Sequence, residues 1–195
     1  MANFIETEQI ITYLDLQFSY LIVRGSIPIF WSQKPNLKYK PSIVLDENKN
    51  QVEICRKHFQ KSVQIYNKNV CVNLVNQHGS EGMLEKKFDN VIKSLNDPYI
   101  KYESFDFHKQ CGNDKWDRLS ILINRLANDQ DAFGYFSASK YGNPLSYQRG
   151  IFRINCIDCL DRTNVVQGLL AKRILHIQLL VFMFVYTLFY LKLFE

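Results

Sequence analysis

The stretch of sequence that decides the fold is RINCIDCLDRTN, residues 153–164. The residues from Ile151 to Asn155 predict a buried strand, and a helix is expected to begin at about Thr163. A tight loop between such a strand and helix can point successive backbone N–H groups at an anion and add the positive end of the helix. The stretch therefore predicts an anion-binding loop that starts at Cys156.

Three side chains of this loop carry the chemistry that we predict for it, transfer of a phosphoryl group to a thiolate. Cys156 is the expected nucleophile, because the field of the loop should lower the pKa of its thiol. Arg162 is expected to clamp two phosphoryl oxygens with its planar guanidinium. Thr163 is expected to hydrogen-bond the thiolate or the phosphate, or else to cap the helix in the ordinary way. Taken singly, a buried cysteine and an arginine in a surface ion pair are common structural features.

Asp158 and Asp161 are unexpected in an anion-binding loop, because carboxylates repel a phosphate. One interpretation is that a carboxyl group, protonated beside the phosphate, acts as general acid on the leaving oxygen and later as general base for water. The other is that these side chains point away and accept backbone N–H bonds that shape the loop. Both interpretations stay open for Asp161, and the second is preferred for Asp158.

The remaining positions of the loop are expected to bind substrate through the loop that they form: Ile157, Asp158, Cys159 and Leu160. Cys159 also has Cys-x-x-Cys spacing from Cys156, so it could form a reversible disulfide with an oxidised Cys156 or simply pack inside the loop. Lys38 and Lys40 are further expected substrate-binding residues. They belong to the segment 24–40, which has four basic residues and no carboxylate. Such a segment suits an anionic membrane surface or a polyphosphate headgroup, and otherwise a solvated loop.

At residues 153–164 the chain resembles a known family, the Sac-domain phosphoinositide phosphatases, and most closely their integral-membrane members of the endoplasmic reticulum and Golgi. The resemblance is shared by further stretches: RGSIPIFWSQ (24–33) with PNLKYKP (35–41), NQHGSE (76–81), and FDFH (105–108) ahead of DRL (117–119). It extends from about Asn3 to Gln167. Twelve residues in register are far more specific than a bare Cys-x5-Arg pattern.

The resemblance implies a phosphoinositide phosphatase that removes a phosphomonoester from the inositol ring of phosphatidylinositol 4-phosphate or 3-phosphate through a phosphocysteine. It implies no metal and no cofactor, a phosphoinositide lipid in a membrane as the partner, and no nucleic acid. It also implies the endoplasmic reticulum or Golgi membrane, with the catalytic part facing the cytosol; the oligomeric state stays open. Because family members have a separate N-terminal subdomain, residues 1–172 are expected to be a partial Sac-type catalytic domain, an apparent fragment.

Two other functional interpretations stay open. The pairs His108-x-x-Cys111 and Cys156-x-x-Cys159 have the ligand types of a structural zinc site. A zinc site, however, does not require Arg162 or the rest of the signature. The second alternative is a catalytically inactive truncated fragment.

The composition and the hydrophobic periodicity indicate a globular α/β fold with a mixed sheet flanked by helices. The residues from Cys156 to Arg162 add the expectation of a cysteine-phosphatase-like phosphate loop between a strand and a helix. The 195 residues are 47% hydrophobic, and their five cysteines, an odd number, favour a reducing compartment over a disulfide framework. Strands are expected at 4–13, 16–23, 70–75 and 102–107, and a loop at 134–144. Helices are expected at 51–66 and 84–95, with a third one near 119–126 capped by Asn113 or Asp114.

Residues 173–195 form a hydrophobic tail that is a possible transmembrane helix. Thirteen uncharged residues from Leu179 to Leu191 are fewer than the roughly twenty that a membrane span needs. Lys172 and Arg173, just before the apolar stretch that begins at Ile174, would keep the catalytic part in the cytosol by the positive-inside rule. Membrane insertion and spurious sequence are both open interpretations of the tail.

Overall fold

The computed structural model describes residues 4–33, 41–112 and 114–191, with the backbone alone at 185, 186 and 188–191. Lys38 and Lys40 lie outside the described residues, so their expected part in substrate binding stays a prediction.

A seven-stranded mixed sheet forms the centre of the described chain, in the order β6-β5-β9-β2-β7-β8 with β1 paired to β2. Its strands are β1 (Phe4–Tyr13), β2 (Leu16–Gly25), β5 (Lys68–Asn73), β6 (Ile100–Ser104), β7 (Phe136–Ser139), β8 (Pro144–Ser146) and β9 (Gly150–Asn155). Strands β6, β5, β9 and β2 run parallel, whereas β1 and β7 pair with β2 antiparallel. The expected mixed sheet is therefore confirmed, and three neighbouring parallel strands, β6, β5 and β9, end at one edge of it.

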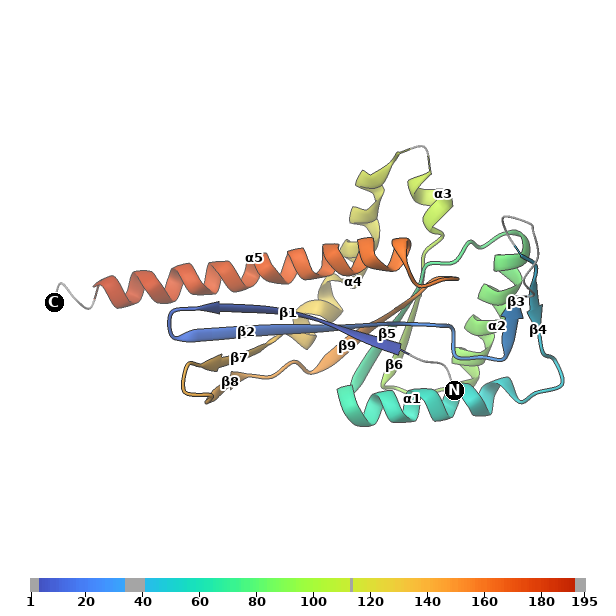
Figure 1. Ribbon diagram of the computed structural model, residues 1–195, viewed down its shortest axis with the longest axis horizontal. Helices are drawn as coiled ribbons and strands as arrows, with labels where there is room; N and C mark the ends of the chain where they lie inside the picture. The colour runs from blue at the N-terminus through green and yellow to red at the C-terminus, as the bar shows by residue number, and fades with distance from the viewer. Residues whose placement is uncertain (1–3, 34–40, 113, 192–195) are drawn as a thin grey trace.

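Helices cover both faces of this sheet (Figure 1). They are α1 (Gln51–Tyr66), α2 (Gly79–Leu95), α3 (Phe107–Cys111), α4 (Leu119–Phe133) and α5 (Asp161–Leu191). Alternation along β5 explains the two layers, because Val70 and Val72 pack with α4 and α5 while Cys71 packs with α1 and α2. A small hairpin of β3 (Trp31–Gln33) and β4 (Ile43–Leu45) stands apart from the main sheet.

Local signals explain most of these elements. The first expected helix and α1 coincide, and the side chain of Asn50 caps α1 by accepting the Glu53 N–H at 3.0 Å. Helix α2 ends at Leu95, where Asn96 adopts the left-handed conformation with φ of 47° that commonly stops a helix. The helices predicted from the spacing of apolar residues and from helix-ending residues are therefore largely confirmed.

Three expectations about local structure were wrong. The segment 134–144 is not all loop, because β7 pairs with β2 in a contact between residues distant in sequence. The expected strand 102–107 ends at Ser104, because Asp106 accepts the Lys109 N–H at 3.0 Å and starts α3 at Phe107. Asp114 does not cap the third helix, since a 3₁₀ turn at Trp116–Arg118 precedes α4; Asn113 lies outside the described residues.

Helix α5 begins at Asp161, two residues before the expected start, and runs 31 residues. Val166, Leu170 and Ile174 bury its first half against the sheet. Farther along, Gln178 and Gln9 on β1 are joined by a 3.3 Å hydrogen bond, and the rings of Phe182 and Tyr13 lie 4.3 Å apart edge to face. The helix therefore stays against the β1–β2 hairpin as far as Phe182 (Figure 1).

One helix in the described part of the chain is long and apolar enough to cross a membrane, Asp161–Phe184, with mean hydropathy 1.5 and 28% of the window buried. Length and composition alone support this, and part of the apolar character belongs to the side chains that pack on the sheet. Beyond that contact, Met183 and Phe184 are exposed.

Candidate active site

The candidate site is a cavity of about 480 Å³ beyond the carboxyl ends of the parallel strands β5 and β9. Its lining comes from four parts of the chain: the β3–β4 hairpin (Gln33, Pro41, Ile43), the start of α2 (Ser80, Glu81), α3 and the turn after it (Phe107, His108, Trp116), and the signature stretch with the residue that follows it (Ile157, Asp158, Asp161, Arg162, Val165). The sequence-predicted Ile157, Asp158, Asp161 and Arg162 therefore meet in one cavity.

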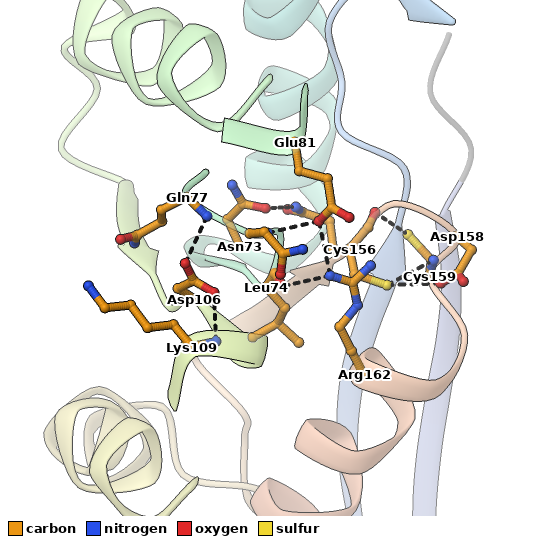
Figure 2. Close-up of polar contacts among 12 residues, drawn as sticks. Asn73, Leu74, Gln77, Glu81, Asp106, Lys109, Cys156, Asp158, Cys159 and Arg162 are labelled. Carbon is orange, nitrogen blue, oxygen red and sulfur yellow. Dashed lines mark hydrogen bonds and ion pairs between the residues drawn. The ribbon is translucent and has the colours of Figure 1, made fainter. Parts of the chain in front are cut away.

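Cys156 follows the last residue of β9 and is fully buried at the base of the loop 156–160. Its Sγ accepts the backbone N–H of Cys159 at 3.1 Å and lies 3.1 Å from Asp158 Oδ1, to which the thiol donates. Cys159 has a left-handed φ of 56°, and its own thiol donates to the Cys156 carbonyl at 3.4 Å. The loop thus folds back on the sulfur, and Cys159 packs inside it (Figure 2). All five cysteines are free thiols.

The expected lowering of the Cys156 pKa is not what this loop produces. The side-chain hydrogen bond with Cys159, burial and the Asp158 carboxylate together raise the pKa of the Cys156 thiol, and the Arg162 charge only partly opposes them. In the same pair, hydrogen bonding with Cys156 lowers the pKa of Cys159 to about 6, although burial acts in the opposite direction. The cause is the way Cys159 and Asp158 fold over the buried sulfur, and the sequence pattern alone does not show which way these side chains point.

The two loop carboxylates differ in their surroundings. Burial alone would raise the pKa of Asp158, but hydrogen bonds from the Cys156 thiol and the Leu160 N–H, with the charge of Arg162, hold it below its ordinary value. Asp158 Oδ1 accepts the Leu160 N–H at 3.1 Å, which is the arrangement of a loop-shaping carboxylate. Asp161 is the first residue of α5 and is exposed on the cavity lining.

Arg162 reaches from the first turn of α5 toward the end of β5. Its Nη1 donates to the carbonyl oxygen of Leu74 at 3.2 Å and to Oε2 of Glu81 at 3.2 Å. Thr163 is buried, and its hydroxyl donates to the Leu160 carbonyl at 2.8 Å rather than to the Cys156 sulfur. Thr163 therefore closes the first turn of the helix, while the guanidinium faces the cavity.

A buried polar network lies behind the loop, and sequence reasoning missed it although its residues open the signature. Arg153 on β9 is fully buried, and it donates to Nε2 of His58 at 3.0 Å, to Oδ1 of Asn155 at 3.3 Å and to the Ser26 carbonyl. Burial and the Arg153 charge lower the pKa of His58 to about 3, so a neutral imidazole accepts this bond. Asn155 in turn donates to Asn73 on β5. The network ties β9 to α1 and β5 directly below Cys156.

We predict that Arg153→Ala lowers the free energy of unfolding by about 3 kcal/mol, because two buried acceptors and the half-buried Ser26 carbonyl lose their donor. Urea unfolding followed by circular dichroism measures this change. Arg125→Ala is the control, since Arg125 forms an exposed pair with Glu103 at 3.1 Å and its loss should cost less than about 1 kcal/mol. Equal effects of the two substitutions would contradict the structural role of the network.

The pairs that suggested zinc do not form a metal site in the described residues. Among residues 4–33, 41–112 and 114–191, no three His, Cys, Asp or Glu side chains are arranged to hold a metal ion. Cys111 is buried among apolar side chains, and His108 is exposed on the rim of the cavity. The donor arrangement therefore gives the zinc alternative no support.

Two carboxylates of the site carried no predicted role, although both lie in stretches that share the resemblance. Glu81 pairs with Arg162 at 3.2 Å. Asp106 is buried and accepts the N–H groups of Gln77 and Lys109, each at 3.0 Å, so it joins the loop before α2 to the start of α3 (Figure 2). The position of Glu81 could have indicated its role. It lies in the first turn of the helix that follows β5, at the sheet edge where Arg162 is also expected.

Comparisons with known proteins agree on the family. The family model described as the SacI homology domain matches residues 1–112. The chain is 51% identical over 178 residues to phosphatidylinositol-3-phosphatase SAC1-A of Danio rerio, covering 91% of this chain and 30% of that protein. It is 48% identical over 173 residues to phosphatidylinositol-3-phosphatase SAC1 of Drosophila melanogaster, covering 89% and 29%.

A similar match reaches a fungal relative. The chain is 41% identical over 187 residues to phosphatidylinositol-3-phosphatase SAC1 of Saccharomyces cerevisiae, with 90% of this chain and 30% of that protein covered. The chain thus spans about 30% of the length of the curated relatives that it matches. The matched residues include more than half of the chain in the family model and nearly all of it in the relatives. On this evidence the chain belongs to the SacI homology domain family.

Proposed function

We propose that this chain carries the catalytic loop of a phosphoinositide phosphatase, which removes a phosphomonoester from the inositol ring through a phosphocysteine. The observation that carries the proposal is that Asp158, Asp161 and Arg162 line one cavity beyond the carboxyl ends of β5 and β9. The buried Cys156 thiol lies directly behind this lining, bonded to Asp158. Relatives that are named phosphatidylinositol-3-phosphatase support the lipid class.

The proposed mechanism begins with deprotonation of Cys156. Asp158 Oδ1 is the acceptor of the thiol hydrogen bond, so Asp158 is the group that can take this proton. Arg162 stabilises the thiolate that results, because its positive charge lowers the pKa of the Cys156 thiol. The thiolate then attacks phosphorus, the S–P bond forms, and the bond from phosphorus to the inositol oxygen breaks.

The second half returns the enzyme to its starting state. The leaving inositol oxygen takes a proton from a carboxyl group on the cavity lining, Asp158 or Asp161. The resulting carboxylate accepts a proton from water, whose oxygen attacks phosphorus and releases phosphate and the Cys156 thiolate. Asp158, which is protonated at this point, then returns a proton to the thiolate and restores the thiol. Arg162 and loop N–H groups stabilise the charge on the phosphoryl oxygens in both steps.

The proposed substrates are phosphatidylinositol 3-phosphate, which the names of the relatives indicate for those proteins, and phosphatidylinositol 4-phosphate, which the family resemblance implies. Phosphate release from vesicles that contain either lipid tests the proposal. Two proteins are assayed: the 195-residue chain, and the Drosophila relative with its matching segment replaced by this chain. Suppose that the Drosophila relative carrying this chain releases phosphate and the 195-residue chain alone does not. The loop would then be catalytic, and the chain by itself would be an inactive fragment. Failure of both would overturn the proposal.

We further propose residues 1–172 as a partial catalytic domain facing the cytosol and residues 173–195 as a segment that contacts an endoplasmic reticulum or Golgi membrane. The exposed end of α5, with Met183 and Phe184, and the hairpin tip at Tyr13 and Leu14 support this contact. Lys172 lies on α5 directly before this segment, is exposed and suits an anionic surface.

We predict that the intact chain stays with microsomes through a high-salt wash, because apolar contact is not screened by salt. The double substitution Met183→Glu and Phe184→Glu should release the protein without disturbing the packed part of α5, since both side chains are exposed. Ile65→Glu on α1, also at an exposed apolar position, is the control and should not release it. Salt release of the intact chain would refute the membrane contact.

A further inference from the structure

The guanidinium of Arg162 is held at one of its three nitrogens, Nη1. Nη1 donates both to the Leu74 carbonyl and to Glu81 Oε2, each at 3.2 Å. Within residues 4–33, 41–112 and 114–191, neither Nε nor Nη2 of Arg162 has a hydrogen-bond partner. Figure 2 shows this opposite edge turned toward the Cys156 sulfur. The planar group therefore presents two parallel donors to the cavity while its third nitrogen is anchored.

Glu81 is itself held in place. It lies in the first turn of α2, and its Oε2 accepts the backbone N–H of Asn76 at 2.8 Å as well as the Arg162 bond. The side chains of Glu81 and Arg162 are each only 14% exposed, so water screens the pair less than it screens a surface ion pair. Leu74 is a second fixed acceptor, because its own N–H is bonded to the Asn155 carbonyl at 2.8 Å.

We propose that Glu81 is a positioning residue for Arg162, which it holds with the Nε–Nη2 edge toward the phosphoryl oxygens. The inference rests on the proposed function and names a residue that this function uses. An arginine at this site has several rotatable bonds, and the two acceptors on Nη1 remove that freedom before the substrate arrives. The negative charge of Glu81 also repels a bound anion. Glu81 therefore favours binding only if the gain from orienting Arg162 is larger than this repulsion.

Two substitutions separate orientation from charge. Glu81→Gln keeps an oxygen that can accept from Arg162 and from Asn76, but it removes the negative charge. Glu81→Ala removes both the charge and the acceptor. Glu85→Ala is the matched control: Glu85 lies one turn later on α2 and accepts from Ser104 Oγ at 2.8 Å, away from Arg162.

The first measurement is calorimetric titration of the 195-residue chain with tungstate, a tetrahedral oxyanion that needs no turnover. Glu81→Ala should weaken tungstate binding about tenfold, because the clamp loses its orientation. Glu81→Gln should stay within about threefold of the unsubstituted chain, since the acceptor is retained. Glu85→Ala should bind as the unsubstituted chain does. Thermal melting of each variant shows whether it is folded.

The second measurement uses phosphate release by whichever protein is active in the vesicle assay. Glu81→Ala should lower kcat about tenfold or more and change KM less, because the clamp is used most in the transition state. Glu81→Gln should restore most of kcat. If no protein turns over substrate, the proposed function fails, while the tungstate titration still tests the positioning role.

The positioning role would be overturned by a folded Glu81→Ala variant that binds tungstate as tightly as the unsubstituted chain. It would also be overturned by a Glu81→Gln variant as impaired as Glu81→Ala, since charge rather than orientation would then decide. Weakening by Glu85→Ala equal to that by Glu81→Ala would likewise refute it, because a general effect on α2 would explain both.

Discussion

We expect phosphate release to fall at least about 1,000-fold when Cys156 is replaced by Ser, because a hydroxyl is far less ionised than a thiol in the same surroundings. The substitution exchanges one atom at a fully buried position, so the loop 156–160 should keep its shape. The assay is release of phosphate from phosphoinositide vesicles by the active protein. Mass spectrometry of an acid-quenched reaction should find phosphate on Cys156 in the unsubstituted protein and none on the serine of the Cys156→Ser variant.

Cys111→Ala is the control for loss of a buried thiol. Cys111 is the last residue of α3, packs in the apolar core and makes no hydrogen bond to the loop 156–160, which lies entirely within the described residues. It should lose some stability and keep its turnover. Near-normal turnover by Cys156→Ser would refute the covalent mechanism.

Much of the architecture could be predicted because it depends on local patterns. The spacing of apolar residues predicts helix α1 at Gln51–Tyr66, and the run Ile151–Asn155 predicts the strand that leads to Cys156. A strand, a loop and a helix in sequence then bring Cys156 and Arg162 to the carboxyl edge of a parallel sheet. The residues of the loop 156–160 could be placed together because they are adjacent in sequence between that strand and that helix.

The parts that escaped prediction depend on residues distant in sequence. Strand β7 is stabilised by pairing with β2, more than a hundred residues earlier, and its own sequence reads as a loop. The Arg162–Glu81 pair joins two elements 81 positions apart, which no local pattern can show. The raised pKa of Cys156 depends on the rotamers of Asp158 and Cys159, and side-chain orientation inside a loop is not encoded by residue spacing.

The environment of the hydrophobic tail also could not be predicted from local sequence. Hydropathy makes the residues after Lys172 a possible span, yet the contacts of Gln178 with Gln9 and of Phe182 with Tyr13 keep that part of α5 on the sheet. An apolar helix face can pack on protein or on lipid, and composition does not separate the two. The position of the β1–β2 hairpin decides it for the first half of the tail.

Arg162→Lys should lower phosphate release by about 100- to 1,000-fold, although the positive charge is kept. The ammonium of lysine is a single point of charge, so it cannot reach the Leu74 carbonyl and Glu81 while also presenting two parallel donors to the phosphoryl oxygens. Most of the loss should appear in kcat, since the clamp acts on charge that develops in the transition state. Steady-state kinetics on the same vesicles separate kcat from KM.

Arg173→Lys on the same helix is the matched control. Arg173 also uses both guanidinium nitrogens, at 2.7 and 3.0 Å from the two carboxylate oxygens of Asp131, but this pair lies away from the cavity. Its substitution should therefore change stability slightly and leave turnover intact. If Arg162→Lys were as active as Arg173→Lys, a positive charge alone would suffice, and both the bidentate clamp and the orienting role of Glu81 would lose their physical basis.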